Sequence, residues 1–301
     1  MPPVWVTDRI EEAGKPVRSN PTGRQLRFGS ELRKLRERAG LSATQSGQLL
    51  GVQQSQISNM EAGRVGVSPE RVRALACQYE CADQPLIKAL TGMTGERTRG
   101  WWEQYRELLP SALLDLAELE HHAKALRDCI TARIPGLLQT RDYAREIFVQ
   151  AVTQLSPPEI EHRLSFRIKR QDVLYRDSPA PYEAVIHEAA LRMKVGGPTV
   201  ARQQLQHLLD MSDRNHITLR VITFDAGAFP GSGQSIYFVH GPVPQLDTVY
   251  LDQSHGIAFL DAEAQLHKYR TLFERLEAVA LTPARTRDLI HTVMQDLKEQ
   301  M

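Results

Sequence analysis

The stretch LSATQSGQLLGVQQSQISNMEAGRVG, residues 41–66, decides the fold of the N-terminal part of the chain. Ser42 is a good N-cap residue, because its hydroxyl can accept a hydrogen bond from a free amide at the start of a helix. Gly51 follows two leucines, where a tight turn needs a positive φ that glycine adopts without strain. A second short helix is expected to begin near Gln53. The stretch therefore predicts two short helices joined by a tight turn.

The second helix has one apolar and one polar face. Ile57 and Met60 lie three residues apart and form the apolar side, whereas the other residues from Gln54 to Asn59 are polar. Gly47, in the first helix, has no side chain, as expected where two helices cross closely. These features in this order are typical of a helix-turn-helix motif that binds DNA.

The polar face supplies candidate DNA contacts. Recognition helices contact base edges near their N-terminal end, and the amides of Gln and Asn match N6 and N7 of adenine in the major groove. We expect base contacts from Gln54, Ser55, Gln56 and Asn59. We expect phosphate contacts from Thr44, Ser58, Arg64, Arg24 and Arg27. The alternative is that these residues only form the solvated face of an amphipathic helix.

The segment resembles the phage-repressor and Cro-like family of helix-turn-helix regulators. The chain departs from the family pattern at Ala43, where a glutamine commonly contacts phosphate, and at Ser46, which is usually apolar. The departures concern one phosphate contact and the packing of the first helix. The matching positions are Ser42, Gly47, Gly51, Gln54, Ser55, Ile57, Ser58 and Glu61.

Basic residues are concentrated near the N-terminus. The whole chain has 37 Lys+Arg against 36 Asp+Glu, but eight basic residues stand against two acidic ones between Lys15 and Arg38. Leu32 and Leu35 mark the buried side of a helix in this segment. We therefore expect its apolar side to face the core and some of its arginines to face the DNA backbone.

Length and composition set the outer limits. A chain of 301 residues predicts about two domains, and 42% hydrophobic and 24% charged residues are ordinary for a globular protein. No long apolar run predicts a membrane span, and the first residues lack the pattern of a signal peptide. Three cysteines favour a reducing, cytoplasmic location. Cys77 and Cys81, four apart on an expected helix, are interpreted as small core residues rather than metal ligands.

The chain divides into four expected parts. These are a flexible N-terminal arm (1–23), a five-helix helix-turn-helix domain (24–91), a linker and connecting helix (92–110), and an α/β effector or partner-binding domain (111–301). In the last part, strands interleaved with helices predict a mixed α/β (α+β) fold. A strand running into a loop with Pro135 and Gly136 is expected over 125–140, and further strands are expected at 182–191, 217–224, 234–240 and 248–252.

Taken whole, the chain resembles actinobacterial regulators that join this motif to a C-terminal domain of unknown function. Such proteins are often described as antitoxin-like transcriptional regulators, so the resemblance implies a small acidic partner protein. The segments that carry it include GRVGVSP (63–69), RGWWEQY (99–105), IPGLLQT (134–140), VGGP (195–198) and ITLRVITFDAGAFPG (217–231).

No segment predicts catalysis. His187 and Glu188 begin like a zinc-protease signature, but Leu191 replaces the second histidine, and the segment has strand composition. Asp252, Ser254 and His255 are triad residue types, but on a strand His255 would point away from the other two. The glycine-rich segment 227–235 lacks the ending of a phosphate loop. We therefore expect no enzyme, no metal and no cofactor.

Two roles are open for the C-terminal domain. A ligand sensor could use Gln139, Thr140, His187 and Glu188, although such strand residues are more often structural. A protein-interaction surface could use the Trp101-Trp102 pair as its anchor, unless these side chains pack between domains.

The sequence thus predicts a cytoplasmic transcriptional regulator that binds a double-stranded DNA operator as a homodimer. Its C-terminal domain would bind a partner protein or a small-molecule signal. The alternatives are an antitoxin-like module whose main task is to neutralise its partner, and a DNA-tethered enzyme.

Overall fold

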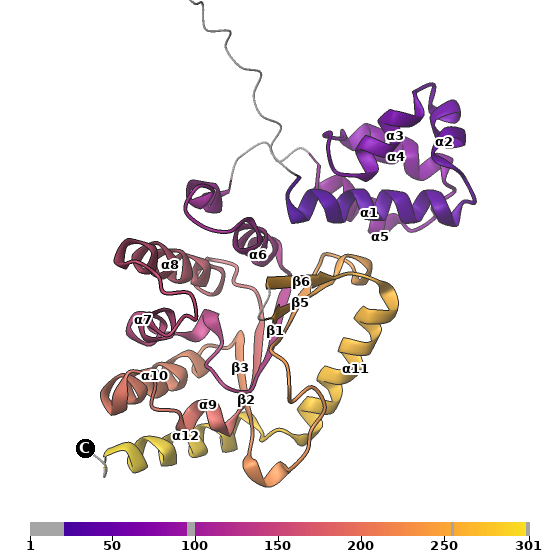
Figure 1. Ribbon diagram of the computed structural model, residues 1–301. Helices are drawn as coiled ribbons and strands as arrows, with labels where there is room; N and C mark the ends of the chain where they lie inside the picture. The colour runs from indigo at the N-terminus through magenta and orange to yellow at the C-terminus, as the bar shows by residue number, and fades with distance from the viewer. Residues whose placement is uncertain (1–20, 95–99, 254–255, 299–301) are drawn as a thin grey trace, which may run out of the picture.

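The computed structural model describes residues 21–94, 100–253 and 256–298. An N-terminal helical region is followed by a C-terminal region built on one six-stranded mixed sheet (Figure 1). This arrangement confirms the predicted fold class. Most of the expected flexible arm, part of the linker, and Ser254 and His255 lie outside the described residues.

Five helices form the helical region. Thr22, Ser42, Ser68 and Asp83 each accept a hydrogen bond from a backbone amide at the start of a helix, which explains where four of the helices begin. Their shared core holds fully buried aliphatic side chains such as Leu32, Ile57, Val72, Leu75 and Leu90. The helices are α1 (Gly23–Arg38), α2 (Ala43–Leu50), α3 (Gln54–Glu61), α4 (Pro69–Gln78) and α5 (Gln84–Gly92).

The sheet of the C-terminal region has the order β3-β2-β1-β4-β5-β6. The first three strands in this order run parallel to one another, and β4, β5 and β6 continue the sheet through antiparallel pairs. The strands are β1 (Ala125–Ile130), β2 (Tyr182–His187), β3 (Ile217–Ile222), β4 (Ile236–His240), β5 (Thr248–Gln253) and β6 (Gly256–Leu260).

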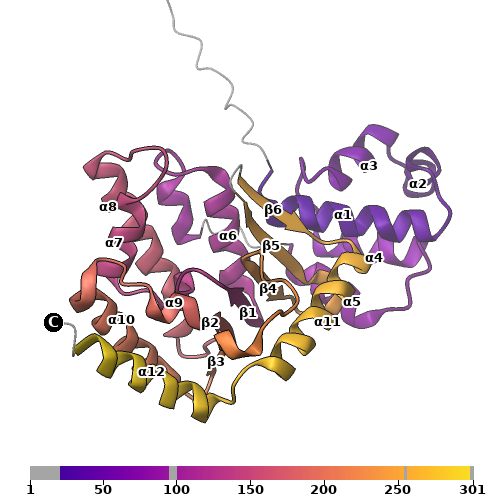
Figure 2. The ribbon, with the colours of Figure 1, turned by 60° about the horizontal axis from the view of Figure 1, so that its bottom comes forward.

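Helices cover both faces of this sheet, because alternate strand residues are apolar on each side. One face packs on α10 and α12, and the other packs on α11 (Figures 1 and 2). The helices of the C-terminal region are α6 (Ser111–His122), α7 (Arg141–Val149), α8 (Pro157–Arg170), α9 (Glu188–Arg192), α10 (Gly197–Ser212), α11 (Glu263–Val279) and α12 (Pro283–Lys298), together with the short 3-10 turns η1 (Trp101–Tyr105), η2 (Gly136–Leu138), η3 (Gln171–Leu174), η4 (Phe224–Ala226) and η5 (Pro244–Leu246).

Three local predictions were wrong. The strand expected over 182–191 ends at His187, whose Nδ1 accepts a hydrogen bond from the Ala189 amide and so starts helix α9. Strand β6 was not predicted at all. Cys77 is exposed, and Cys81 follows the end of α4, so the two cysteines do not share a helix face.

The two regions are held together by a mixed polar and apolar interface. Arg27 of α1 forms an ion pair with Asp261 at 3.1 Å and donates to the carbonyl of Gln245. Gln245 in turn donates to the α5 cap Asp83 at 2.8 Å. Leu246, which follows β4 in the chain, is only 5% exposed and packs in the core of the helical region. Figure 1 shows α1 and α5 on the side of the helical region nearest the sheet, with α2 and α3 beyond α1.

Candidate nucleic-acid interface

The turn between α2 and α3 has the predicted geometry. Ser42 and Gln45 form a reciprocal capping box, in which the Gln45 amide donates to Ser42 Oγ at 3.2 Å. Gly51 has φ 64° at the end of α2. A Cβ on Gly47 would lie 2.7 Å from the Val52 carbonyl oxygen, so a larger residue would push the two helices apart. These residues set the angle at which α3 leaves the turn.

Helix α3 is fixed to α1 by contacts that the sequence analysis missed. Arg36 donates two hydrogen bonds to the Glu61 carboxylate, at 2.6 and 2.9 Å, and both side chains are about one-tenth exposed. A Cβ on Gly29 would lie 2.3 Å from the Glu61 carbonyl oxygen, so α1 and α3 cross backbone to backbone. Ile57 and Met60 are buried, as predicted. The orientation of α3 is therefore set before any DNA binds.

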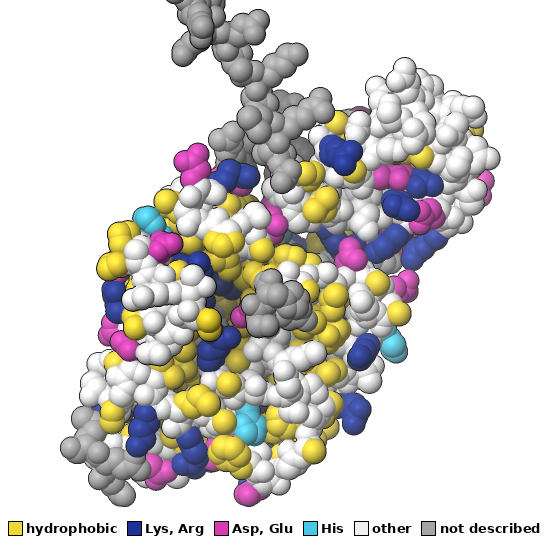
Figure 3. Space-filling view, in the orientation of Figure 1, with side chains coloured by type: hydrophobic (Ala, Val, Ile, Leu, Met, Phe, Trp, Pro, Cys, Tyr) yellow, Lys and Arg dark blue, Asp and Glu magenta, His cyan; other side chains and the backbone are white. Residues whose placement is uncertain are grey.

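The opposite face of α3 is exposed and uncharged. Gln54, Ser55 and Gln56 are exposed, and Ser58 and Asn59 are half-buried. The Gln54 amide donates to Ser58 Oγ at 2.8 Å, which restricts its side chain without burying it. Figures 1 and 2 show this helix on the side of α1 that faces away from the sheet. On the face seen in Figure 3, side chains at this end of the molecule are mostly uncharged.

The candidate phosphate ligands fall into two groups. Thr44 on α2 and Arg64 after α3 are exposed and border the polar face, on which Ser58 also lies. Arg64 forms no ion pair with any residue that the structure describes. Arg24 and Arg27 lie elsewhere, because both line a pocket between the helical and C-terminal regions. Only the first group lies beside α3.

Several residues of the basic segment have partners within the protein. The Arg27 side chain is 10% exposed and pairs with Glu31 and Asp261, so most of its hydrogen-bonding capacity is used within the protein. Lys34 also pairs with Glu31, at 2.7 Å, and Arg38 with Glu263, at 3.3 Å. Some acidic partners of these basic residues lie one helical turn away on α1, and others lie far away in the sequence. Arg27, Lys34 and Arg38 each contact the C-terminal region, through Asp261 or Glu263.

Ser46 departs from the family pattern without leaving a defect. Its side chain is fully buried, and its Oγ lies 2.6 Å from the Tyr79 hydroxyl, with which it shares a hydrogen bond. Burial raises the pKa of Tyr79, so this hydroxyl stays protonated at neutral pH. A buried serine costs little when its hydroxyl is paired, which explains why the helix tolerates it.

Two candidate effector residues support a loop. Gln139 is 3% exposed, donates to the Ile134 carbonyl at 2.7 Å, and accepts a hydrogen bond from Arg167. Thr140 is the N-cap of α7, and its amide donates to Gln204 at 2.7 Å. These contacts hold the segment that follows β1.

The other effector candidates also have partners within the protein. Glu188 is 8% exposed and accepts from Arg192 at 2.7 Å and from the Phe224 amide at 3.0 Å. His187 stacks on Phe229, with ring centroids 5.4 Å apart. Trp102 is 5% exposed and packs with Trp101 in a small cluster between η1 and α8. The tryptophans thus pack against residues of α6 and α8 within the C-terminal part of the chain.

Of the three residues considered as a triad, only Asp252 lies within the described ranges. Asp252 is exposed and lies 3.5 Å from Arg133, while its proposed triad neighbours fall outside the described ranges. No group of three or more His, Cys, Asp or Glu residues suited to a metal ion occurs in the part of the chain that the structure describes. Within the same ranges, no helix is long and apolar enough to cross a membrane.

Comparison with known families agrees with this division of the molecule. Residues 27–90 match the model of a helix-turn-helix domain, and residues 113–292 match a domain of unknown function (DUF5753). No curated protein and no solved structure matches the chain significantly. The helix-turn-helix domain makes the protein a DNA-binding regulator. Since the second match covers more than half of the chain, the protein belongs to the DUF5753 family, here joined to an N-terminal helix-turn-helix domain.

Proposed function

We propose that the protein is a sequence-specific transcriptional regulator of the phage-repressor and Cro-like type, with α3 as the helix that enters the major groove. The observation that carries this proposal is the exposure of Gln54, Ser55 and Gln56 on a helix whose other face is fixed to α1. A rigid helix that presents free amides away from the rest of the molecule suits the reading of base edges.

Each residue of this face has a proposed role. Gln54, Ser55, Gln56 and Asn59 contact bases, and the hydrogen bond from Gln54 to Ser58 holds the first amide near its contact position. Thr44, Ser58 and Arg64 contact phosphates on either side of the groove. With few charges on this face, we expect a small number of phosphate contacts, and sequence discrimination comes from the base contacts.

The proposal includes a homodimer. One helical region covers only a single half-site, so two copies would bind half-sites separated by about 34 Å, or one helical turn of DNA, or a multiple of that spacing. Footprinting tests this directly. A single isolated half-site that is bound tightly by a monomer would contradict it.

We also propose that the C-terminal region, over 111–301, regulates DNA binding by receiving a small acidic partner protein or a small molecule. The size of this region supports the proposal, because a six-stranded sheet with helices on both faces is larger than a dimer interface alone would require. Regulation requires that the signal binds the DNA-competent and incompetent states unequally.

The experiment that tests the DNA-binding role uses a duplex selected from a random library by the full-length protein. Gln54→Ala and Asn59→Ala each remove a base contact and should cost about 1–3 kcal/mol of discrimination, measured by fluorescence anisotropy. Binding to unrelated DNA should persist, since phosphate contacts supply it. Gln84→Ala, an exposed glutamine on α5, is the matched control. If both α3 variants bind the selected duplex like the control, α3 is not the recognition helix.

A further inference from the structure

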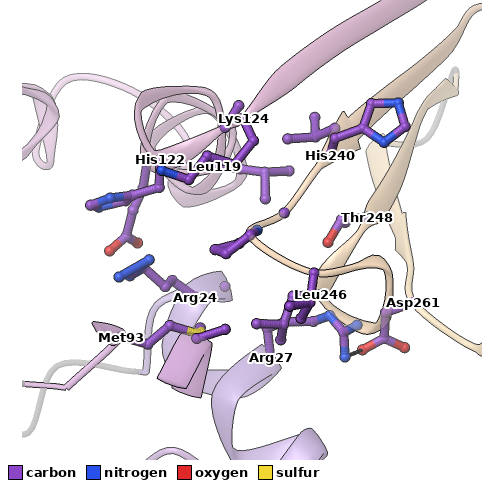
Figure 4. Close-up of a pocket in the computed structure, with 18 of the residues that line it drawn as sticks. Arg24, Arg27, Met93, Leu119, His122, Lys124, His240, Leu246, Thr248 and Asp261 are labelled. Carbon is purple, nitrogen blue, oxygen red and sulfur yellow. Dashed lines mark ion pairs between the residues drawn. The ribbon is translucent and has the colours of Figure 1, made fainter. Parts of the chain in front are cut away.

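A pocket of about 820 Å³ lies between the helical region and the C-terminal region (Figure 4). Its walls come from α1 and α5 on one side, and from α6, the segment after β4, and strands β5 and β6 on the other. This volume is in the range of pockets that hold small organic ligands. The pocket is thus formed by both regions and is complete only while they are docked.

Unpaired polar atoms are concentrated on this pocket. Six buried side-chain atoms have no hydrogen-bond partner among the described residues, and three of them belong to pocket-lining residues: Thr248 Oγ1, Arg27 Nε and Glu118 Oε2. Thr248 is 4% exposed and forms part of the β5 wall in Figure 4. A buried polar group without a partner lowers stability unless water or a ligand satisfies it. The pocket therefore offers two donors and a carboxylate to an occupant.

The remaining walls are largely apolar, with two lysines. Leu26, Met93, Leu119 and Phe259 contribute apolar surface from four different elements. Lys88 and Lys124 line the same pocket, are exposed, and form no ion pair with the described residues. Burial, followed by the nearby Arg24, lowers the pKa of His122 to about 3, so this ring is neutral at physiological pH. The lining has four basic residues (Arg24, Arg27, Lys88 and Lys124) and three acidic ones (Asp115, Glu118 and Asp261), so its formal charge, counted without histidine, is +1. The two exposed lysines are the part of this positive charge that has no acidic partner.

The same pocket is lined by the residues that dock the two regions. Arg27 joins α1 to Asp261, and Leu246 inserts into the helical core. A molecule that fills the pocket touches both sides of this interface, so it stabilises the docked arrangement over any separated one. In the docked arrangement α3 faces away from the C-terminal region and is open to DNA.

We propose that this pocket binds a small amphipathic molecule with an apolar body and an anionic oxygen-bearing end, and that its binding raises DNA affinity. The second clause rests on the proposed DNA-binding function, and the first does not. The apolar body would lie against Leu119, Met93 and Phe259. The anionic end would be held by the lysines, and a ligand oxygen would pair with Thr248 or Arg27.

The first test measures binding without DNA. Decanoate, decan-1-ol and decylamine have the same chain and differ only in the charge of the end group. Each is titrated into the full-length protein by calorimetry, below its critical micelle concentration. Decanoate is expected to bind with one site per chain and with at least about fivefold higher affinity than decylamine. Equal affinities for all three, or no binding of decanoate, would overturn the site.

A pair of threonine variants locates the probe. Thr248→Val removes a hydroxyl with no protein partner, so it should leave stability unchanged or raised while it weakens decanoate binding about threefold to tenfold. Thr286 is equally buried, but its hydroxyl accepts a hydrogen bond from the Val221 amide at 3.1 Å and lies outside the pocket. Thr286→Val should therefore lower stability and leave decanoate affinity unchanged. The same change in decanoate affinity in both variants would place the probe elsewhere.

The lysines test the charge of the ligand. Lys88→Met and Lys124→Met should weaken decanoate binding and leave decan-1-ol binding unchanged, because only decanoate carries a negative charge. An equal loss for both probes would contradict an anionic end group.

The coupling is tested last, with the selected duplex. Saturating decanoate should raise DNA affinity at least about fivefold, within the usual range of coupling between two sites. Thr248→Val should need more decanoate to reach the same effect. If DNA affinity stays constant or falls while decanoate is bound, the coupling between the two sites is wrong. The calorimetric titration tests decanoate binding by itself, so that result would not depend on the coupling. A failure to select any DNA would count against the proposed function alone.

Discussion

On α3 the polar side chains from Gln54 to Gln56 are exposed and uncharged, whereas α6 and α8 bury a charged pair, Glu120 and Arg170, against each other. Glu120 is 4% exposed and Arg170 is 7% exposed, and Arg170 Nε donates to Glu120 at 2.8 Å. The exposed face of α3 keeps hydrogen-bonding capacity free for a partner. The Glu120–Arg170 pair, like Arg36–Glu61 in the helical region, uses charge internally to fix how two helices pack. The exposed and the buried polar groups are thus expected to respond differently to substitution.

The largest contrast is expected for the buried pair. Arg170→Met leaves Glu120 buried without its counter-ion and should destabilise the protein by about 3–5 kcal/mol, measured by urea unfolding. Arg33 and Glu37 form the matched pair on the surface of α1, where the side chains are 63% and 51% exposed. Arg33→Met should have a much smaller effect on the free energy of unfolding, because water and salt screen that pair. If both variants lose a similar amount of stability, burial does not determine how much an ion pair contributes.

How far the sequence predicts these features depends on the distance between interacting residues. The turn at Gly51 and the cap at Ser42 are local, since each rests on residues within one helical turn, and both were predicted correctly. The Arg36–Glu61 pair joins residues 25 apart, and no periodic pattern in the sequence relates them.

The role of Arg27 was harder still to predict. Its partners Gln245 and Asp261 lie more than two hundred residues away, so the basic segment looked available for DNA. The alternation of apolar residues predicted the central strands, but β6 pairs with one neighbour only and carries a weaker pattern. The pocket between the regions could not be predicted either, because it exists only once both are folded and docked.

A second prediction concerns pH, and it separates the buried acids of the C-terminal region from exposed ones. Burial raises the pKa of Asp128 to about 8, although the Tyr182 hydroxyl donates to its Oδ2 at 2.6 Å. The folded protein therefore holds a proton that the unfolded chain releases above about pH 4. This contribution to stability is complete below that pH and is lost as the pH rises toward about 8.

Urea unfolding at pH 5 and pH 8 measures this effect. We expect the free energy of unfolding of the wild-type protein to fall by more than about 1 kcal/mol from pH 5 to pH 8, since each pKa unit corresponds to about 1.4 kcal/mol. Asp128→Asn keeps an acceptor for the Tyr182 hydroxyl and carries no titrating group, so its free energy of unfolding should fall less over the same pH interval. Asp225→Asn, at an exposed position, should show the same fall as the wild type. If Asp128→Asn falls as much as the wild type, the pH dependence comes from another group.

The smallest expected effect tests whether the exposed face of the helical region binds DNA with few charges. Arg64 is exposed beside α3, and it is the basic residue of that face proposed to contact a phosphate. Each phosphate contact contributes about 0.9 to the slope of log affinity against log salt concentration. Arg64→Gln should therefore lower the slope by about one unit and weaken binding to all DNA sequences alike. Arg38→Gln is the control, because this exposed arginine pairs with Glu263 of the C-terminal region. The slope should be unchanged in that variant, and an equal decrease in both would mean that α1 also contacts the DNA backbone. A steep slope that survives Arg64→Gln would show that DNA binding depends on basic residues elsewhere in the molecule, and not on the exposed face around α3 alone.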